Sequence, residues 1–169
     1  VKQTFGSDGV PLNVEGAFHT YLMTGAADAF KAALLEAEFD EPDCRVISNY
    51  TGTYHATDPA RVKAYLFFQI FYPVRWIWGM HKALSDGVNI IVEFGGGIGS
   101  GEGPDTKRPN LAGITKTVLR KFDGNVLYQP AITAASLRDT ANLFRALRTV
   151  KNRLPPGTPI PEEPPLRLF

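Results

Sequence analysis

One histidine of this sequence stands where a catalytic group would be expected, in the segment 16–20, which reads Gly-Ala-Phe-His-Thr. The segment directly follows a predicted strand and precedes a predicted helix, a place where α/β enzymes hold catalytic side chains on short loops. Histidine is the side chain that most readily exchanges a proton near neutral pH, so His19 could act as a general base. A lone histidine is more often an ordinary loop or core residue, and His19 therefore needs support from the rest of the chain.

That support comes from further segments, which follow one another in the order and approximate spacing of one enzyme family. Each segment alone is a weak signal, and the ordered set is specific. Together with residues 16–19, the set resembles the malonyl-CoA:acyl-carrier-protein transacylases over roughly residues 12–121. The segments are Leu-Met at 22–23, Ser-Asn-Tyr-Thr-Gly at 48–52, Gln69, Pro-Val-Arg-Trp at 73–76 and Val-Glu-Phe-Gly-Gly-Gly at 92–97.

The resemblance implies a mechanism that uses a serine and a histidine. In the family, a serine in a Gly-His-Ser-x-Gly turn attacks the thioester of malonyl-CoA, and a histidine takes the serine proton and later activates the carrier-protein thiol. By resemblance, the catalytic residues of this chain are His19 and Gln69, whose main-chain carbonyl orients the ring. A neutral acceptor at Nδ1 fixes the tautomer that leaves Nε2 free as a base.

The resemblance also implies two substrate-binding residues, Phe18 and Asn49. Phe18 resembles the residue that crowds the α-carbon of the acyl group in related acyltransferases, which favours malonyl over methylmalonyl. No metal and no bound cofactor are implied, since malonyl-CoA is the substrate and the acyl carrier protein brings its own phosphopantetheine.

The sequence departs from the family in two places. It holds no Gly-x-Ser-x-Gly segment, since Ser100 has Ile98 and Glu102 at the flanking glycine positions. The family's serine, its malonate-gripping arginine and its oxyanion-hole donors all precede the covered region, so this chain alone is not expected to form an acyl-enzyme. The family's Gly-Pro-Gly is Gly-Gly-Gly at 95–97, followed by an extra polar stretch at 98–108, which predicts a looser loop.

Other reactive side chains have simpler explanations. The glycine run at 95–97 lacks the remaining residues of either phosphate-binding motif. His55 and His81 have no metal-ligand partner at a suitable spacing and are expected at the surface. Cys44 has no sequence neighbour that would activate its thiol. As the single cysteine, it excludes an intrachain disulfide and a multi-cysteine metal site, which fits a reducing compartment.

The composition indicates one globular domain of 169 residues, 44% hydrophobic and 21% charged. The formal net charge of +1 is evenly spread, which argues against nucleic acid and an anionic membrane as partners. The most apolar stretch, 64–78, is shorter than a membrane-spanning helix of about 20 residues and is interrupted by polar residues and a proline.

Helical and strand-like segments alternate, which predicts an α/β fold, the C-terminal portion of an α/β-hydrolase-like acyltransferase core with a mostly parallel sheet flanked by helices. Residues 1–150 are expected to form this acyltransferase-like domain, and the Pro-rich residues 151–169 an extended tail. Strands are expected at 10–14, 45–49, 88–94 and 125–128, the first three parallel or nearly so. Helices are expected at 24–39, from Thr57 to Pro73, from Trp76 to Gly87, from Pro109 and from Ser136. Thr24 is expected to be the N-cap of the first helix, and Asp139 is expected to accept from the free N–H groups at the start of the last one.

Two functions remain open. The first is malonyl transfer from CoA to the carrier-protein thiol in fatty acid synthesis, with His19 supplied by this chain; Phe18 and Gln69 support it. The second is an inactive or incomplete homologue, a structural component of a large assembly such as a mitochondrial, ribosome-associated one; the insertion at 98–108 and the proline tail support it.

Expected partners are the acyl carrier protein and an N-terminal half, upstream of Val1, or another protein chain that covers the sheet. The expected location is the mitochondrial matrix or another organelle, with the bacterial cytoplasm as the alternative.

Overall fold

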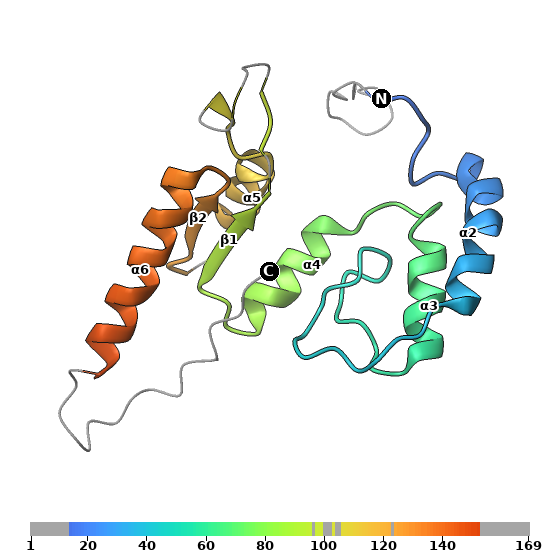
Figure 1. Cartoon of the computed structure of the whole chain (residues 1–169), viewed down its shortest axis with the longest axis horizontal. Helices are drawn as coiled ribbons and strands as arrows, with labels where there is room; N and C mark the ends of the chain where they lie inside the picture. The colour runs from blue at the N-terminus through green and yellow to red at the C-terminus, as the bar shows by residue number, and fades with distance from the viewer. Residues whose placement is uncertain (1–13, 96, 100–102, 104–105, 123, 153–169) are drawn as a thin grey trace. The chain divides into compact units, whose positions relative to one another are not determined.

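The computed structural model describes residues 14–95, 97–99, 103, 106–122 and 124–152, with side chains through residue 149. The chain divides into two compact units, Val1–Arg75 and Trp76–Phe169, which are described in turn (Figure 1). The predicted strand at 10–14 lies outside the described residues except for Val14, which is not in a strand. The predicted tail lies outside them from residue 153 onward, so the domain boundary at 150 stays a prediction.

The first unit is built on two helices that pack against each other, α2 (Thr24–Glu36) and α3 (Pro59–Phe68). A short 3-10 turn, η1 (Tyr21–Met23), leads directly into α2. The helix buries Ala27 and Leu34, which are seven residues apart and therefore lie on one face. This amphipathic pattern confirms the helix predicted from residue 24.

The predicted helix boundaries in this unit were wrong by a few residues, since α2 ends at Glu36 and not at residue 39, and α3 ends at Phe68 and not at Pro73. Thr24 is not an N-cap, because the preceding 3-10 turn continues into α2 and the Thr24 N–H already donates to the Tyr21 carbonyl. Asp58, rather than Thr57, caps α3; its carboxylate accepts from the Arg61 N–H at 3.1 Å. Pro59 follows at the first helical position, where its missing N–H costs nothing.

The predicted strand at 45–49 does not form. Within the described residues this segment makes a single antiparallel bridge, between Ile47 and Tyr54, and no parallel pairing. The chain reverses at Gly52, whose φ of 69° lies in the left-handed region that glycine adopts easily. Residues 46–55 therefore fold back on themselves and do not enter a sheet.

The second unit alternates helices and strands, as the sequence predicts, and confirms the α/β class. Its elements are α4 (Trp76–Ser85), β1 (Ile90–Phe94), α5 (Ala112–Leu119), β2 (Leu127–Ala131) and α6 (Ala134–Asn152). Strands β1 and β2 pair in parallel, with Ile90 opposite Leu127 and Phe94 opposite Ala131. Parallel neighbours need a crossover connection, and here it contains α5. Helix α6 packs on β2, and α4 contacts α5.

The hydrophobic core of the second unit forms where the sequence predicts a buried strand. Val88, Ile91 and Val92 are buried, and each contributes about 1.5–3 kcal/mol on the usual scale of apolar burial. Gly87, at a φ of 87°, ends α4 as predicted. The other buried apolar side chains of this unit are Met80, Ala83, Leu84, Val118 and Ala131.

Among the described residues, no helix combines the length and apolar character needed to cross a membrane.

Several predicted boundaries of the second unit are also corrected, since β1 begins at Ile90 and not at 88, and α5 begins at Ala112 and not at Pro109. Strand β2 extends to residue 131 and includes Pro130. Proline has no N–H to donate to a neighbouring strand, so a strand tolerates it at a sheet edge, where no such donor is needed. Helix α6 begins at Ala134, two residues before the predicted start. Thr133 caps this helix, because its Oγ1 accepts from the Ser136 N–H at 3.1 Å. The Ser136 hydroxyl reaches back and accepts from the Thr133 N–H at 2.9 Å, which is the role predicted for Asp139.

Candidate active site

His19 is joined to the end of α3 at two points. Its ring Nδ1 lies 2.8 Å from the main-chain oxygen of Gln69, and its backbone N–H donates to the Ile70 carbonyl at 3.2 Å. The last carbonyls of a helix have no intrahelical partner and remain available to other donors. The predicted bond between His19 and Gln69 is therefore confirmed, and it uses a carbonyl that the end of α3 leaves free.

This bond determines where the imidazole carries its proton. A main-chain carbonyl can only accept, so Nδ1 must be the protonated nitrogen in the neutral ring. The lone pair is then on Nε2, which can take a proton from a nucleophile. His19 is exposed, so the ring is accessible from solvent.

The backbone of His19 is held in an unusual conformation. Its φ of 60° makes His19 the one non-glycine residue with positive φ within the described ranges. Such a conformation costs of the order of 1–3 kcal/mol and persists where the surrounding contacts enforce it, often at functional sites. The sequence alone gives no signal for this strain.

Phe18 lies directly before His19 and is 55% exposed. Its ring covers Gly16, so a Cβ added at position 16 would lie only 3.3 Å from Phe18 Cζ. Ordinary van der Waals contact begins at about 3.5 Å. The absence of a side chain at Gly16 thus allows the observed position of the Phe18 ring.

Asn49 is exposed and belongs to a loop held by main-chain hydrogen bonds. Its carbonyl accepts from the Arg75 N–H at 2.9 Å, and the Gly52 N–H donates to the Ser48 carbonyl at 2.8 Å. His19 and Asn49 thus attach to opposite ends of the segment 69–75. The structure brings both residues to that segment, and within the described part no hydrogen bond joins them to each other.

A cluster of rings, which the sequence reasoning missed, surrounds the end of α3. The Tyr50 ring centroid lies 5.1 Å from those of Phe68 and Tyr72. Aromatic pairs at such distances contribute about 0.5–1.5 kcal/mol each beyond burial. The contacts connect the Asn49 loop to the turn that carries the Gln69 carbonyl, and the density of aromatic residues at 65–72 is the signal that could have revealed them. The remaining rings of the cluster are Tyr65, Phe67 and Phe71.

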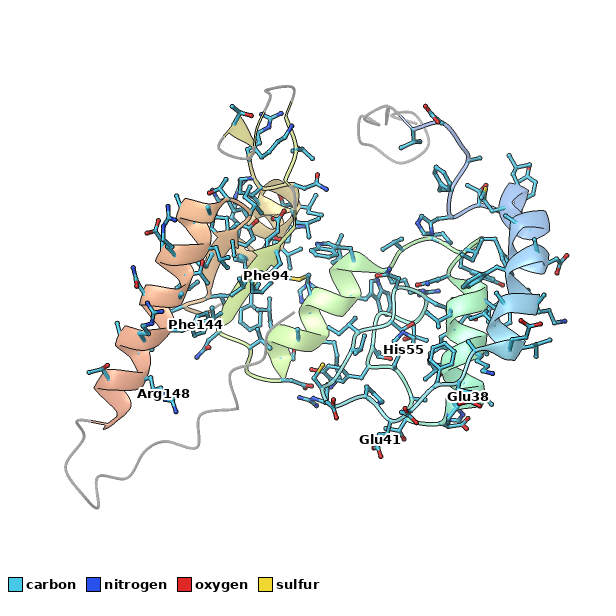
Figure 2. The ribbon with its side chains drawn as sticks, viewed as in Figure 1. Glu38, Glu41, His55, Phe94, Phe144 and Arg148 are labelled. Carbon is cyan, nitrogen blue, oxygen red and sulfur yellow. The ribbon has the colours of Figure 1, made fainter. Side chains whose placement is uncertain are left out.

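His55 belongs to the same region and corrects a prediction. His55 lies in the first unit (Figure 2) and is half-buried, not a surface residue. Its ring centroid is 5.6 Å from that of Tyr65. Its Nδ1 is buried and has no hydrogen-bond partner among the described residues. Burial lowers the pKa of His55. His81 is exposed on α4, as predicted.

The described residues contain no group of three His, Cys, Asp or Glu side chains arranged to hold a metal ion. In Figure 2, Glu38 and Glu41 lie in the first unit, as His55 does, and both are exposed. Cys44 is exposed and not disulfide-bonded.

In the second unit, Glu93 is a buried carboxylate to which the sequence analysis assigned no role. It is 7% exposed; Oε1 accepts from the Asn110 N–H at 2.7 Å and Oε2 from the Leu111 N–H at 3.0 Å. The Tyr128 hydroxyl donates to the same carboxylate. Glu93 thus supplies the cap of α5, for which Leu111 offers no side-chain acceptor. A charged residue inside a strongly apolar strand was the available sequence signal.

Burial raises the pKa of Tyr128, and its hydrogen bond to Glu93 and the nearby negative charge raise it further. Tyr128 comes from β2 and Glu93 from β1, so the pair joins the two strands of the sheet to the start of α5.

The base of the glycine-rich loop after β1 is paired, although the sequence predicts a loose connection. Ile98 and Arg108 exchange two main-chain hydrogen bonds of 2.9 Å. At Gly97 a Cβ would lie 2.8 Å from the Arg108 oxygen, so this glycine permits a close backbone approach. Much of the predicted insertion at 98–108 lies outside the described residues.

Comparison with known proteins identifies relatives of this chain. No model of a known protein family matches the sequence. The malonyl CoA-acyl carrier protein transacylase of Bacillus subtilis (strain 168) is 33% identical over 121 residues, which is 72% of this chain and 34% of that protein. The chain is a relative of the malonyl CoA-acyl carrier protein transacylases. It spans about a third of the length of the curated relatives that it matches.

Solved structures of transacylases share the fold. The malonyl CoA-acyl carrier protein transacylase from Clostridium perfringens matches with a TM-score of 0.68 at 21% identity, over 90% of this chain and 43% of that chain. A type II PKS acyl-carrier protein in complex with its malonyl-transacylase matches with a TM-score of 0.59 at 26% identity, over 76% of this chain and 36% of that chain. The resemblance inferred from the ordered segments is therefore confirmed, and the partial α/β acyltransferase fold with it.

Proposed function

We propose that the protein carrying this chain transfers a malonyl group from CoA to the thiol of an acyl carrier protein, and that His19 is its general base. The observation that carries the proposal is the 2.8 Å distance from His19 Nδ1 to the Gln69 carbonyl oxygen. This contact leaves the Nε2 lone pair as the ring's proton acceptor. The names of the relatives support the reaction class.

In the first half-reaction, a serine outside this sequence attacks the thioester carbonyl of malonyl-CoA. The serine oxygen forms an ester bond, the carbon–sulfur bond breaks, and His19 Nε2 moves the hydroxyl proton to the departing sulfur. In the second half-reaction, the carrier-protein thiol gives its proton to His19 and attacks the ester. A new carbon–sulfur bond forms, the carbon–oxygen bond of the ester breaks, and the proton passes from His19 to the departing serine oxygen.

A neutral partner for the histidine is compatible with this chemistry. A carboxylate would stabilise the charged imidazolium, whereas the Gln69 carbonyl mainly fixes ring orientation and tautomer. A thiol is a good leaving group, so its departure demands less of the proton donor than an amine would. Phe18 is proposed as the residue that limits the size of the acyl group, and Asn49 as a second substrate-binding residue.

Two partners follow from the proposal. One is an acyl carrier protein, since one structurally similar transacylase was solved in complex with such a protein. The other is the remainder of an acyltransferase core. In the described part, β1 and β2 form a two-stranded sheet, and such small sheets are marginal without further strands or covering elements. The assembly-component role, the mitochondrial location and the bacterial alternative stay predictions.

The test is to purify the complete gene product and measure transfer of labelled malonyl from CoA to a carrier-protein thiol. His19→Ala should lower the rate by roughly 10²–10⁴-fold, the usual contribution of a positioned general base. His81→Ala, at an exposed position of α4, is the matched control and should leave the rate unchanged. Transfer that is insensitive to His19→Ala would contradict the proposed role. The 169-residue chain alone should show no covalent malonyl adduct by mass.

A further inference from the structure

Thr20 makes hydrogen bonds that span the turn containing His19. Its hydroxyl donates to the Ala17 carbonyl at 2.7 Å and accepts from the Leu22 N–H at 3.3 Å. Its own carbonyl accepts from the Met23 N–H at 3.0 Å. The hydroxyl thus connects a residue before His19 to the start of the helical segment after it.

The turn needs such a connection because His19 has a positive φ of 60°. Left to itself, a non-glycine residue relaxes toward negative φ, which would turn the side chain to a new direction. The contacts to Gln69 and Ile70 oppose this relaxation from one side of the turn. The Thr20 hydroxyl opposes it from within the turn.

We propose that Thr20 is a positioning residue for His19: its hydroxyl maintains the turn in which the His19 ring reaches the Gln69 carbonyl. The inference rests on the proposed general-base role of His19. The Thr20 hydroxyl has a single proton and donates it to the Ala17 carbonyl. Thr20 is therefore assigned no proton transfer in the proposed reaction. A role limited to capping η1 would affect stability without affecting the histidine ring.

The first test follows the His19 ring of the complete gene product by long-range ¹H–¹⁵N NMR. Thr20→Val removes the hydroxyl at nearly constant volume and should convert the Nδ1-protonated form to a mixture of tautomers. Thr20→Ser retains the hydroxyl and should restore the original spectrum. Thr24→Val is the matched control, because Thr24 is exposed and its hydroxyl makes no hydrogen bond with any described residue. An unchanged His19 ring in Thr20→Val would overturn the proposal.

The second test measures malonyl transfer by the complete gene product. Thr20→Val should lower kcat by roughly 10–100-fold, the scale expected when a catalytic group is misplaced by a fraction of an ångström to an ångström, and should change KM by less than about twofold. Thr20→Ser should recover most of kcat. A lower melting temperature with unchanged kcat, measured where the variant is folded, would reduce Thr20 to a helix cap and contradict the proposal. If the unsubstituted protein transfers no malonyl, the proposed function fails, while the NMR result still decides whether Thr20 positions His19.

Discussion

The ring Nδ1 of His19 and the main-chain oxygen of Gln69 are 2.8 Å apart, although the residues are fifty positions apart in the chain. The acceptor belongs to the backbone at the end of α3, so the contact depends on where that helix ends. The nature of the side chain at position 69 is not part of this contact. The contact should therefore survive substitution of the Gln69 side chain.

Gln69→Ala should retain malonyl transfer to within about threefold, because the substitution leaves the accepting carbonyl in place. His19→Ala serves as the reference for complete loss of the base, with a decrease of roughly 10²–10⁴-fold. Both variants are compared in the same assay on the complete gene product. Equal losses in the two variants would mean that the Gln69 side chain, rather than its carbonyl, acts in the reaction.

The sequence was sufficient to predict the main contact of the site and most of the helices. The contact between His19 and Gln69 was predicted because several short segments in a specific order resemble the transacylase family, and the resemblance implies a main-chain carbonyl that orients the histidine. Helices α2 and α4 followed from apolar residues at helical spacing. Burial of Val88, Ile91 and Val92 followed from a short run that is apolar except for Asn89.

Helix caps and strand pairing were harder to predict, because several nearby residues can bond to the same main-chain N–H and C=O groups. Ser136 was expected to begin a helix, but Thr133 is the N-cap and Ser136 reaches back to it from the first turn. Thr24 was expected to be an N-cap, but a 3-10 turn precedes it and continues into the helix. Residues 45–49 have strand-like composition, yet the turn at Gly52 pairs them locally. The role of Glu93 depends on main-chain N–H groups at 110–111, which leave no mark in the side-chain sequence.

Phe18→Ala should raise the rate with methylmalonyl-CoA relative to malonyl-CoA by roughly tenfold, because relief of crowding by one methyl group is worth about 1–3 kcal/mol. Gly16→Ala keeps the ring but forces it to shift, since the new Cβ would lie 3.3 Å from Phe18 Cζ. We expect a smaller change of the same ratio. The measurement is competition between the two substrates.

Gly25→Ala is the matched control for Gly16→Ala, because a Cβ at Gly25 meets no atom within 4 Å. It should leave the substrate ratio unchanged and, as a glycine replaced within α2, stabilise the fold by up to about 1 kcal/mol. A ratio that does not respond to Phe18→Ala would remove Phe18 from the acyl site.

Tyr128 should make the stability of the second unit depend on alkaline pH. Burial and the contact with Glu93 raise its pKa in the folded state above the ordinary value of about 10. Above that pH the unfolded chain loses the phenol proton while the folded chain keeps it, so stability is fully present below about pH 10 and falls as pH rises further. Urea unfolding followed by tryptophan fluorescence reports on this unit, since Trp76 and Trp78 both lie in α4.

Tyr128→Phe should remove the loss of stability at alkaline pH that is due to the Tyr128 phenol, while other groups continue to titrate. Tyr21→Phe is the control, because Tyr21 is 76% exposed and makes no ring contact within the described residues. The informative quantity is the difference in pH dependence between each variant and the unsubstituted chain. Equal pH dependence in Tyr128→Phe and the unsubstituted chain would contradict the assigned environment of Tyr128.

His55 should make the first unit sensitive to acid. Burial lowers its pKa in the folded state below the ordinary value of about 6.5, and its Nδ1 has no partner among the described residues that could stabilise a charge. The unfolded chain therefore binds the proton first as pH decreases, so stability is fully present above about pH 6.5 and is lost as pH falls toward the folded pKa. Amide hydrogen exchange at Ser48 and Gly52, both buried, reports on this unit. His55→Gln should flatten the pH dependence of this exchange between about pH 7 and 5, after correction for intrinsic exchange. His81→Gln, at an exposed site, is the control and should not flatten it. An identical acid response in both variants would show that His55 titrates as a solvent-exposed group.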